Sequence, residues 1–288
     1  MDSSDFEMLM KFIYVFFTLL VLLLILLLIL RLLDWRASQL HWIELSSLQP
    51  VNPERYDSSM VADLPEPAQR YFNFTIASGT PLYTVAEIDM GGQFSLGSKE
   101  EPNYQPMLAY QILAAPYGFL WRLHLPGIIP VSGSDSGRWT RFRILRVIPV
   151  ARMGGDSDHT RSAYGRYVAE AVFWTPAAVL PRAGVKWEAI DEHTARVTIT
   201  HGKLSQAVDV TVNSSGQPVE VSFMRWSNAN PEKSYRLQPF GGTLSDFRGV
   251  QGFNLPFRVV AGNMFGTNDY FPFFKAEVKA IRFPGFEK

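Results

Sequence analysis

Residues 161–181 read RSAYGRYVAEAVFWTPAAVLP, the one convincing helix pattern inside a long run of strand-like segments. Apolar side chains recur along this stretch at the spacing of one helix face. They are Tyr164, Tyr167, Val168, Ala171 and Val172. Pro176 and Pro181 end the pattern, because proline cannot continue a helix. The stripe is wide enough to pack on a sheet, so the stretch predicts a helix that lies against the strands on either side of it in sequence.

The flanking sequence changes its apolar period from 3.6 residues towards 2, which is typical of strands. Eleven short segments are rich in aromatic and β-branched residues and are bounded by turn formers. They are residues 82–90, 107–114, 119–125, 139–147, 185–190, 195–200, 207–212, 219–226, 235–240, 255–261 and 274–282. Turn sequences at 191–193, 213–216 and 249–252 indicate an antiparallel meander. Because so many strands curl a sheet, we predict a mainly β fold, a curved antiparallel sheet or half-open β-barrel.

Two helices accompany these strands in the prediction. The helix at 161–174 interrupts the meander once, so we expect it to lie across or inside the concave face of the sheet. A second helix is expected after Asp63, a candidate N-cap that is followed by prolines near the helix start. Its apolar stripe consists of Ala68, Tyr71, Phe72 and Ile76. The sheet is therefore predicted to carry one or two packed helices.

Near the N-terminus, residues 12–30 are uncharged and almost wholly apolar, FIYVFFTLLVLLLILLLIL. At ~1.5 Å per residue, this run is about 29 Å long and matches the ~30 Å hydrocarbon core of a bilayer. It is longer than the apolar core of a signal peptide, and no small-residue cleavage site follows it. Arg31, Trp35, Arg36 and Trp42 come next, as at the interfacial end of an anchor. We predict a single transmembrane helix before the sheet.

These patterns divide the chain into four parts. The parts are a short polar tail at 1–11, the transmembrane helix at 12–33, a juxtamembrane segment and linker at 34–60, and a β-rich globular domain at 61–288. Within the third part, residues 35–45 can continue as a short amphipathic helix, and residues 46–59 are rich in Ser, Pro and Asn. The lysines and arginines beside the apolar run differ by one charge between its two ends, a slight bias towards a cytoplasmic domain.

Composition removes several classes of function. Lys plus Arg equals Asp plus Glu at 27 each, so no overall field attracts a nucleic acid, and we expect no nucleic-acid partner. With 47% hydrophobic residues, the chain can bury a sizeable core. It contains no cysteine, which excludes disulfides, thiolate metal sites and a cysteine nucleophile.

Motifs for metal binding and catalysis are also missing from the sequence. The five histidines show no i, i+4 pair and no HExxH, and no GxSxG, SxxK, Walker or GxGxxG pattern occurs. Asp156, Asp158 and His159 cluster in MGGDSDHT, where a cation could bind, but acidic residues just before a helix more often cap it. We therefore predict no metal site and no cofactor.

A family resemblance rests on several motifs. They are LPEPAQRYF at 64–72, VIPVAR at 147–152, RYVAEAVFW at 166–174, VLP at 179–181 and VKWEAIDEHTARVTI at 185–199. The chain resembles a bacterial family of uncharacterised proteins, a domain of unknown function, over most of residues 62–283. That family is similar in outline to lipoprotein-carrier half-barrels, which implies a half-open barrel with helices at its mouth. Where relatives often carry Gly-Glu, this chain has Ser162 and Ala163, which weakens any catalytic role for that position.

The candidate binding-site residues lie mainly on the 161–174 helix. They are Arg166, Tyr167, Glu170, Trp174 and, on a strand, Trp187. They gather polar and aromatic groups where the helix is expected to face the sheet. In the alternative interpretation, Tyr167 and Trp174 are core residues. Arg166 then pairs with Glu170 or Glu188. Further tryptophans on separate strands can line a cavity or only fill it: Trp121, Trp139 and Trp226.

Three functions stay open from the sequence. The anchor, the aromatic strands and the missing motifs favour a membrane-anchored, non-catalytic domain that binds a lipid or another apolar ligand. The second function is an accessory subunit whose helix and neutral surface contact partner subunits of a membrane complex. The third is a hydrolase that uses carboxylates such as Glu170 and Asp156. The resemblance to lipoprotein carriers indicates the extracytoplasmic side of a bacterial inner membrane for the globular domain, against the slight charge bias.

Overall fold

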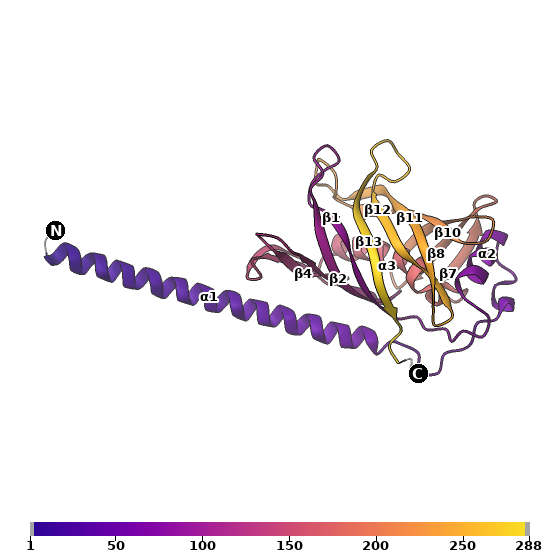
Figure 1. Cartoon of the computed structure of the whole chain (residues 1–288), viewed down its shortest axis with the longest axis horizontal. Coiled ribbons are helices and arrows are strands. Elements are labelled where there is room, and N and C mark those ends of the chain that lie inside the picture. Colours follow the sequence, from indigo (N-terminus) through magenta and orange to yellow (C-terminus); the bar gives the residue numbers. More distant parts are fainter. Residues whose placement is uncertain (1–2, 286–288) are drawn as a thin grey trace.

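One open, 13-stranded antiparallel sheet dominates the computed structural model, which describes residues 3–285 (Figure 1). The strands are β1 Ala86–Ser95, β2 Tyr104–Ala114, β3 Gly118–Leu125, β4 Val131–Ser136, β5 Thr140–Ile144, β6 Ile148–Met153, β7 Val185–Ala189, β8 Thr194–His201, β9 Leu204–Val212, β10 Pro218–Ser227, β11 Arg236–Val250, β12 Phe253–Asn263 and β13 Phe271–Arg282. The helices are α1 Ser3–Ser46, α2 Glu66–Thr75 and α3 Ser157–Trp174, with 3₁₀ turns η1 Ser58–Val61 and η2 Pro176–Val179. The predicted mainly β fold, with a curved antiparallel sheet behind an N-terminal apolar helix, is confirmed.

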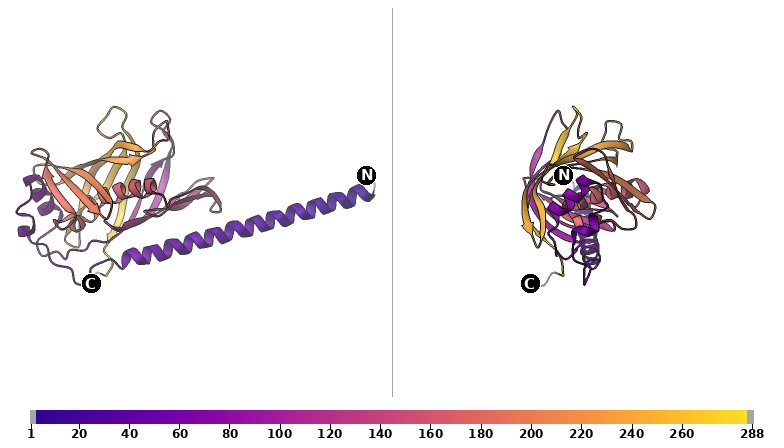
Figure 2. Two further views of the ribbon diagram at one scale, coloured as in Figure 1. Left: turned by 180° about the vertical axis from the view of Figure 1, so that it is seen from behind. Right: turned by 90° about the vertical axis from the view of Figure 1, so that its right-hand side faces the viewer.

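The strand order explains why α3 crosses the sheet. The order is β6-β5-β4-β3-β2-β1-β13-β12-β11-β10-β9-β8-β7, so two meanders meet where β1 pairs with β13. The chain therefore leaves β6 at one edge of the sheet and has to reach β7 at the opposite edge. It covers this distance with α3 and η2, and α3 runs inside the curve of the sheet (Figure 1, Figure 2). This path agrees with the position expected for the 161–174 helix.

Local sequence sets the ends of α3 and the face that it buries. Asp156 caps the helix by accepting a hydrogen bond from the backbone N–H of His159 at 2.7 Å. Pro176 follows the helix end and cannot continue the backbone hydrogen bonding. All five residues of the predicted apolar stripe are buried. One of them, Tyr164, also donates its hydroxyl to the Ile199 carbonyl at 3.0 Å, which ties the helix to β8.

α2 packs near the β7 edge of the sheet. The rings of Tyr71 and Phe72 are buried against Trp187 of β7, with centroids 5.5 and 5.3 Å from the indole. The Tyr71 hydroxyl donates to the Val172 carbonyl, so that α2 is bonded to α3. The second expected helix is thus present, but the predicted N-cap Asp63 is wrong: the N-cap residue is Pro65, which forms no side-chain cap hydrogen bond. It closes the core at the end of the sheet that lies away from α1 (Figure 1).

α1 continues beyond the apolar run and packs on the outer face of the sheet. Leu45 is buried with Ile112 of β2 and Leu120 of β3, on the face opposite to α3. The Trp42 indole donates to the Glu87 carboxylate of β1 at 2.8 Å. The short helix expected at 35–45 is therefore the last part of α1, and it is joined to the sheet by side-chain contacts.

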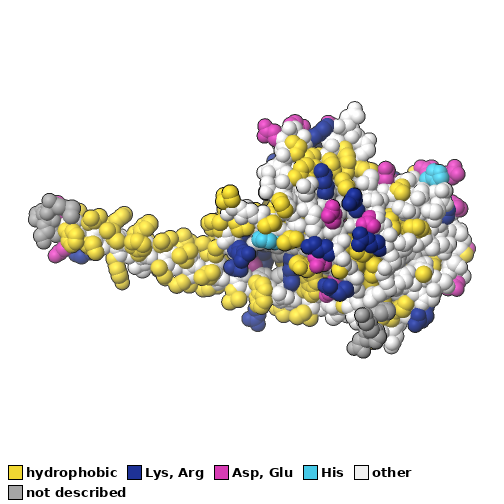
Figure 3. All heavy atoms as spheres, viewed as in Figure 1, with side chains coloured by type: hydrophobic (Ala, Val, Ile, Leu, Met, Phe, Trp, Pro, Cys, Tyr) yellow, Lys and Arg dark blue, Asp and Glu magenta, His cyan; other side chains and the backbone are white. Residues whose placement is uncertain are grey.

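A buried carboxylate fixes α1 against β5 and β6. The Asp34 side chain is 6% exposed and pairs with Arg141 at 2.8 Å, with Arg152 at 2.6 Å and with Arg143. Such pairing is what a buried charge requires. Among residues 3–285, α1 is the helix long and apolar enough to cross a membrane, and no residue of its most apolar stretch is buried. Figure 3 shows hydrophobic side chains along its free length and Lys and Arg side chains where it meets the sheet.

β4 and β6 are not among the predicted strands, and β11 is longer than predicted. β4 has the small and polar sequence VSGSDS, so its pairing with β3 and β5, rather than its own propensity, holds it extended. β6 contains Pro149 and lies at the edge of the sheet, where proline is tolerated. β11 continues through Gly241 and Gly242. Glycines are common in turns, so the predicted strand ended before them.

Candidate ligand-binding cavity

A cavity of about 560 Å³ lies between α3 and the concave face of the sheet. Its walls come from α3 and from strands of both meanders, and most of the lining side chains are apolar. The aromatic ones are Phe94, Trp121, Phe142, Phe173, Trp174, Phe223, Phe240, Phe273 and Phe274. Sites for small molecules typically enclose roughly 300–1,000 Å³. The space therefore suits one ligand of that class.

Strand alternation and a few small residues keep this space open. Every second side chain of a strand points to the same face, so β10 presents Val221, Phe223 and Arg225 to the cavity. On the opposite wall the lining includes Ala169 of α3, and β12 contributes Ala261. The sheet curves around α3. Because Ala169 and Ala261 are small, they leave part of the space between α3 and the sheet unfilled.

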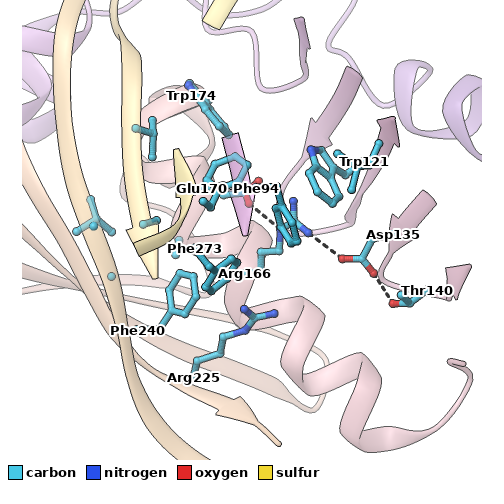
Figure 4. A pocket seen from close by; sticks show the side chains of 18 of the residues that line it. Phe94, Trp121, Asp135, Thr140, Arg166, Glu170, Trp174, Arg225, Phe240 and Phe273 are labelled. Atoms are coloured by element: carbon cyan, nitrogen blue, oxygen red, sulfur yellow. Dashed lines mark hydrogen bonds and ion pairs between the residues drawn. The ribbon is translucent and has the colours of Figure 1, made fainter. Parts of the chain in front are cut away.

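Arg166 of α3 is the centre of a polar network in the cavity wall. Its Nη1 donates to Asp135 of β4 at 2.8 Å, and its Nε donates to Glu170 at 2.7 Å (Figure 4). The guanidinium lies 4.6 Å from the Phe119 ring centroid and 4.9 Å from that of Trp121. Burial alone would lower the pKa of Arg166, but the two carboxylates outweigh it and hold the pKa above its ordinary value. Arg166 is a cation whose charge is compensated within the protein.

The network provides a donor for every oxygen of both carboxylates. Gln111 donates its amide to the second oxygen of Glu170 at 2.5 Å, and the Thr140 hydroxyl donates to the second oxygen of Asp135 at 2.5 Å. Nε2 of His159 lies 3.1 Å from the same hydroxyl. All four carboxylate oxygens thus accept a hydrogen bond.

Arg225 of β10 has no bonded carboxylate, although the charges of Asp135 and Glu170 offset part of the cost of its burial. Its Nε is buried without a hydrogen-bond partner, and no ion pair to it occurs among the described residues. Its guanidinium lies 5.0 Å from the ring centroid of Phe240. Burial, and then the neighbouring Arg166, lower the pKa of Arg225 to about 10. At neutral pH the cavity therefore contains a protonated arginine whose charge is not matched by a bonded carboxylate.

The predicted site residues divide between the cavity and the core. Those that line the cavity are Arg166, Glu170 and Trp174. Tyr167 faces β3 instead, and its hydroxyl donates to the Pro116 carbonyl at 3.3 Å. Trp187 lies in the core beneath α2, where its indole donates to the Val179 carbonyl at 2.9 Å. The Arg166–Glu170 pair expected from helical spacing is present, and the pairing with Glu188 is replaced by one with Asp135.

The sequence reading missed two of the charged groups in the wall. Asp135 belongs to β4, whose polar sequence gave no strand signal. Arg225 lies inside the predicted strand at 219–226, in phase with Val221 and Phe223. A charged residue in phase with the apolar side of a strand can be identified from sequence as a candidate site residue, because burial of an isolated charge is costly unless it has a partner.

The other sequence candidates have structural roles. Asp156 caps α3, and Asp158 accepts a hydrogen bond from the Trp226 indole at 2.8 Å. Within residues 3–285 no group of three His, Asp or Glu side chains is arranged to hold a metal ion. Of the strand tryptophans, Trp121 lines the cavity, whereas Trp139 is buried on the outer face beneath α1.

Comparison with known proteins gives a family and two distant structural likenesses. The model described as "Family of unknown function (DUF6544)" matches residues 54–276. No curated protein matches the sequence. A LolA superfamily protein from Nitrosomonas europaea is similar with a TM-score of 0.39 and 11% identity, over 75% of this chain and 91% of that chain. A domain described as an outer membrane lipoprotein-sorting protein from Vibrio parahaemolyticus is similar with a TM-score of 0.33 and 9% identity, over 80% and 93%.

Proposed function

For this chain, which belongs to the DUF6544 family of unknown function, we propose a role as a membrane-anchored, non-catalytic domain that binds a lipid or another apolar ligand. The observation that carries the proposal is the aromatic-walled cavity of about 560 Å³ between α3 and the sheet. A ligand that fills it removes apolar surface from water, which is the main source of favourable binding free energy for such molecules.

An apolar surface surrounds one end of the cavity. The lining there includes Leu96, Leu125 and Val131, and a smaller pocket of about 250 Å³ shares these residues and continues to the β3–β4 loop. Exposed apolar side chains follow on this loop and on the β5–β6 hairpin. We call them the apolar rim: Ile128, Ile129, Leu145, Ile148 and Val150. Ile128 of the β3–β4 loop is fully exposed. Ile148 and Val150 are exposed on the edge strand β6, and this much exposed apolar surface on an edge strand is unusual in a soluble monomer.

The apolar rim lies alongside α1. Arg143 of β5 pairs with Asp34, and the hairpins around β4 extend along α1 towards its N-terminus (Figure 1, Figure 2). Leu27 and Leu30 of α1 are partly covered, whereas Leu28 and Ile29 between them are exposed. In the proposal, α1 crosses the bilayer, and the apolar rim enters the leaflet that lies next to the globular domain. The ligand then passes between this leaflet and the cavity.

The proposal sets the globular domain on the extracytoplasmic side of a bacterial inner membrane. The support for this side is the family resemblance found in the sequence. A C-terminal reporter enzyme that is active only outside the cytoplasm should therefore work when fused to the chain. Activity of a reporter that works only in the cytoplasm would reverse the orientation without affecting the binding proposal.

Filling the cavity tests the binding function. Ala169→Phe combined with Ala261→Phe places one ring on the helix wall and one on the sheet wall. The full chain is extracted from membranes in mild detergent and analysed by native mass spectrometry. We expect a co-purifying lipid on the native chain and at least a ten-fold loss of it from the double variant, because the added rings occupy the ligand's space.

Ala189→Phe is the matched control, because Ala189 is exposed on β7. This variant should keep the lipid of the native chain. Circular dichroism and the thermal midpoint show whether the double variant retains its fold. A folded double variant that carries as much lipid as the native chain would exclude the cavity as the binding site.

A further inference from the structure

We propose that Arg225 binds an anionic head group of the ligand, so that the cavity selects amphiphiles with one apolar portion and a carboxylate or phosphate. This inference rests on the proposed binding function and adds the chemical class of the ligand. Its starting point is the contrast between the two arginines of the cavity. Arg166 has two bonded carboxylates, whereas the buried Nε of Arg225 has no partner.

A buried donor without an acceptor is costly, and a buried cation costs more. Native proteins therefore satisfy such groups with the protein, with water or with a ligand. Arg225 lines the cavity, so a molecule inside it can supply the missing acceptor. Asp135 and Glu170 are near enough to affect its pKa, but neither forms an ion pair or hydrogen bond with Arg225, and each of their oxygens already accepts a bond from another donor.

The geometry of arginine favours an anion with two oxygens. A guanidinium presents a planar fork of N–H donors that matches a carboxylate or a phosphate. The lining around Arg225 contains Phe223 and Phe240, which suit an apolar chain but offer no competing acceptor from their side chains. The wall thus combines one cation with a large apolar surface, which is the complement of a fatty acid or an anionic lipid rather than of a neutral oil.

The experiment compares charged and neutral ligands that share one tail. The full chain in amphipol is titrated with cis-parinaric acid and with its methyl ester, and tail fluorescence reports binding. We expect the native chain to prefer the acid at least ten-fold. Arg225→Met should reduce this preference to less than two-fold while the affinity for the ester stays within two-fold. Arg225→Lys, which keeps the charge, should retain most of the preference.

Arg258→Met is the control, because Arg258 is exposed on β12 and does not line the cavity. It should bind both ligands as the native chain does. Competition by dioleoyl phosphatidylglycerol, with phosphatidylcholine as its zwitterionic counterpart, distinguishes a lipid phosphate from a free fatty acid as the source of the anion. Displacement by phosphatidylglycerol alone identifies a lipid head group with a net negative charge. With displacement by neither lipid, the carboxylate of the acid is the anion that binds; both outcomes agree with an anionic ligand.

Equal binding of acid and ester by the native chain overturns the role of Arg225 and leaves the binding function intact. An equal loss of both ligands in Arg225→Met also overturns it, because a lost charge contact weakens only the acid. If the native chain binds neither ligand and carries no lipid from membranes, the binding function itself fails, and the inference fails with it.

Discussion

Arg166 and Arg225 line the same cavity, yet they are expected to affect stability in opposite directions. Folding holds the pKa of Arg166 above its ordinary value, so the protonated side chain favours the folded state. Folding lowers the pKa of Arg225 to about 10, so its proton favours the unfolded chain. The cost of Arg225 is therefore present throughout the range below pH 10 and fades as the pH rises from there towards the ordinary arginine value.

Replacing each arginine with methionine tests this contrast. Arg166→Met leaves Asp135 and Glu170 without their cation, and breaking a largely buried pair costs about 3 kcal/mol or more. Arg225→Met removes a buried Nε donor that has no hydrogen-bond partner and should raise the free energy of unfolding of the ligand-free chain by about 1–2 kcal/mol. Unfolding of delipidated protein at pH 7.5, followed by tryptophan fluorescence, measures both changes.

Destabilisation by Arg225→Met of the same size as by Arg166→Met would contradict this account of the cavity. It would show that Arg225 has a structural role within the protein. Arg225→Lys separates charge from packing, because it keeps the cation and should show no gain in stability.

For individual residues, the sequence predicted contacts within one helix and missed contacts between a helix and a strand. The four-residue spacing of Arg166 and Glu170 predicted their pair correctly. Asp135, the second partner of Arg166, lies 31 residues away in sequence, on a strand that only its neighbours hold extended. Helical spacing contains no information about such a partner.

The element that links the cavity to a membrane is α1 with the β5–β6 hairpin beside it. The sequence predicted the apolar length of α1 because hydropathy is a local property. It did not predict that Asp34 binds Arg141, Arg143 and Arg152, because these residues are more than 100 positions away along the chain. These ion pairs hold the apolar rim alongside α1. If α1 crosses a bilayer, the depth of the β5–β6 hairpin in that bilayer can be measured.

A spin label on the β5–β6 hairpin tests whether the apolar rim enters the bilayer. The chain has no cysteine, so Ile148→Cys gives a single labelling site on the exposed edge strand β6. In nanodiscs we expect the label to be more accessible to oxygen than to a water-soluble nickel complex, because oxygen partitions into hydrocarbon. The measurement is power-saturation electron paramagnetic resonance.

Ile190→Cys is the matched site, an exposed isoleucine directly after β7 at the opposite edge of the sheet. Its label should be accessible mainly to the nickel complex. Equal accessibility profiles at the two sites would place the apolar rim in water and would separate the cavity from the bilayer.

For the whole molecule, the sheet is one continuous surface whose two edges are joined only by the segment that contains α3. A 13-stranded sheet curves, and the crossing helix keeps its two halves apart where small residues line the interior. The sequence predicted curvature and a helix on the concave face from the number of strands and the single helical interruption. It left open whether side chains line a cavity there or fill the space, because this depends on how side chains from β1, β10, β12 and α3 meet, and no local pattern records that.

The central claim is that the space between α3 and the sheet holds a lipid while the chain is in its membrane. Photo-crosslinking in intact cells tests this most directly, with p-benzoylphenylalanine in place of Phe273 inside the cavity and in place of Ile190 outside it. We predict that light attaches a lipid to the chain labelled at position 273 and not to the chain labelled at 190, as detected by mass spectrometry of the purified protein. Attachment at neither position, or equally at both, would contradict a lipid in the cavity.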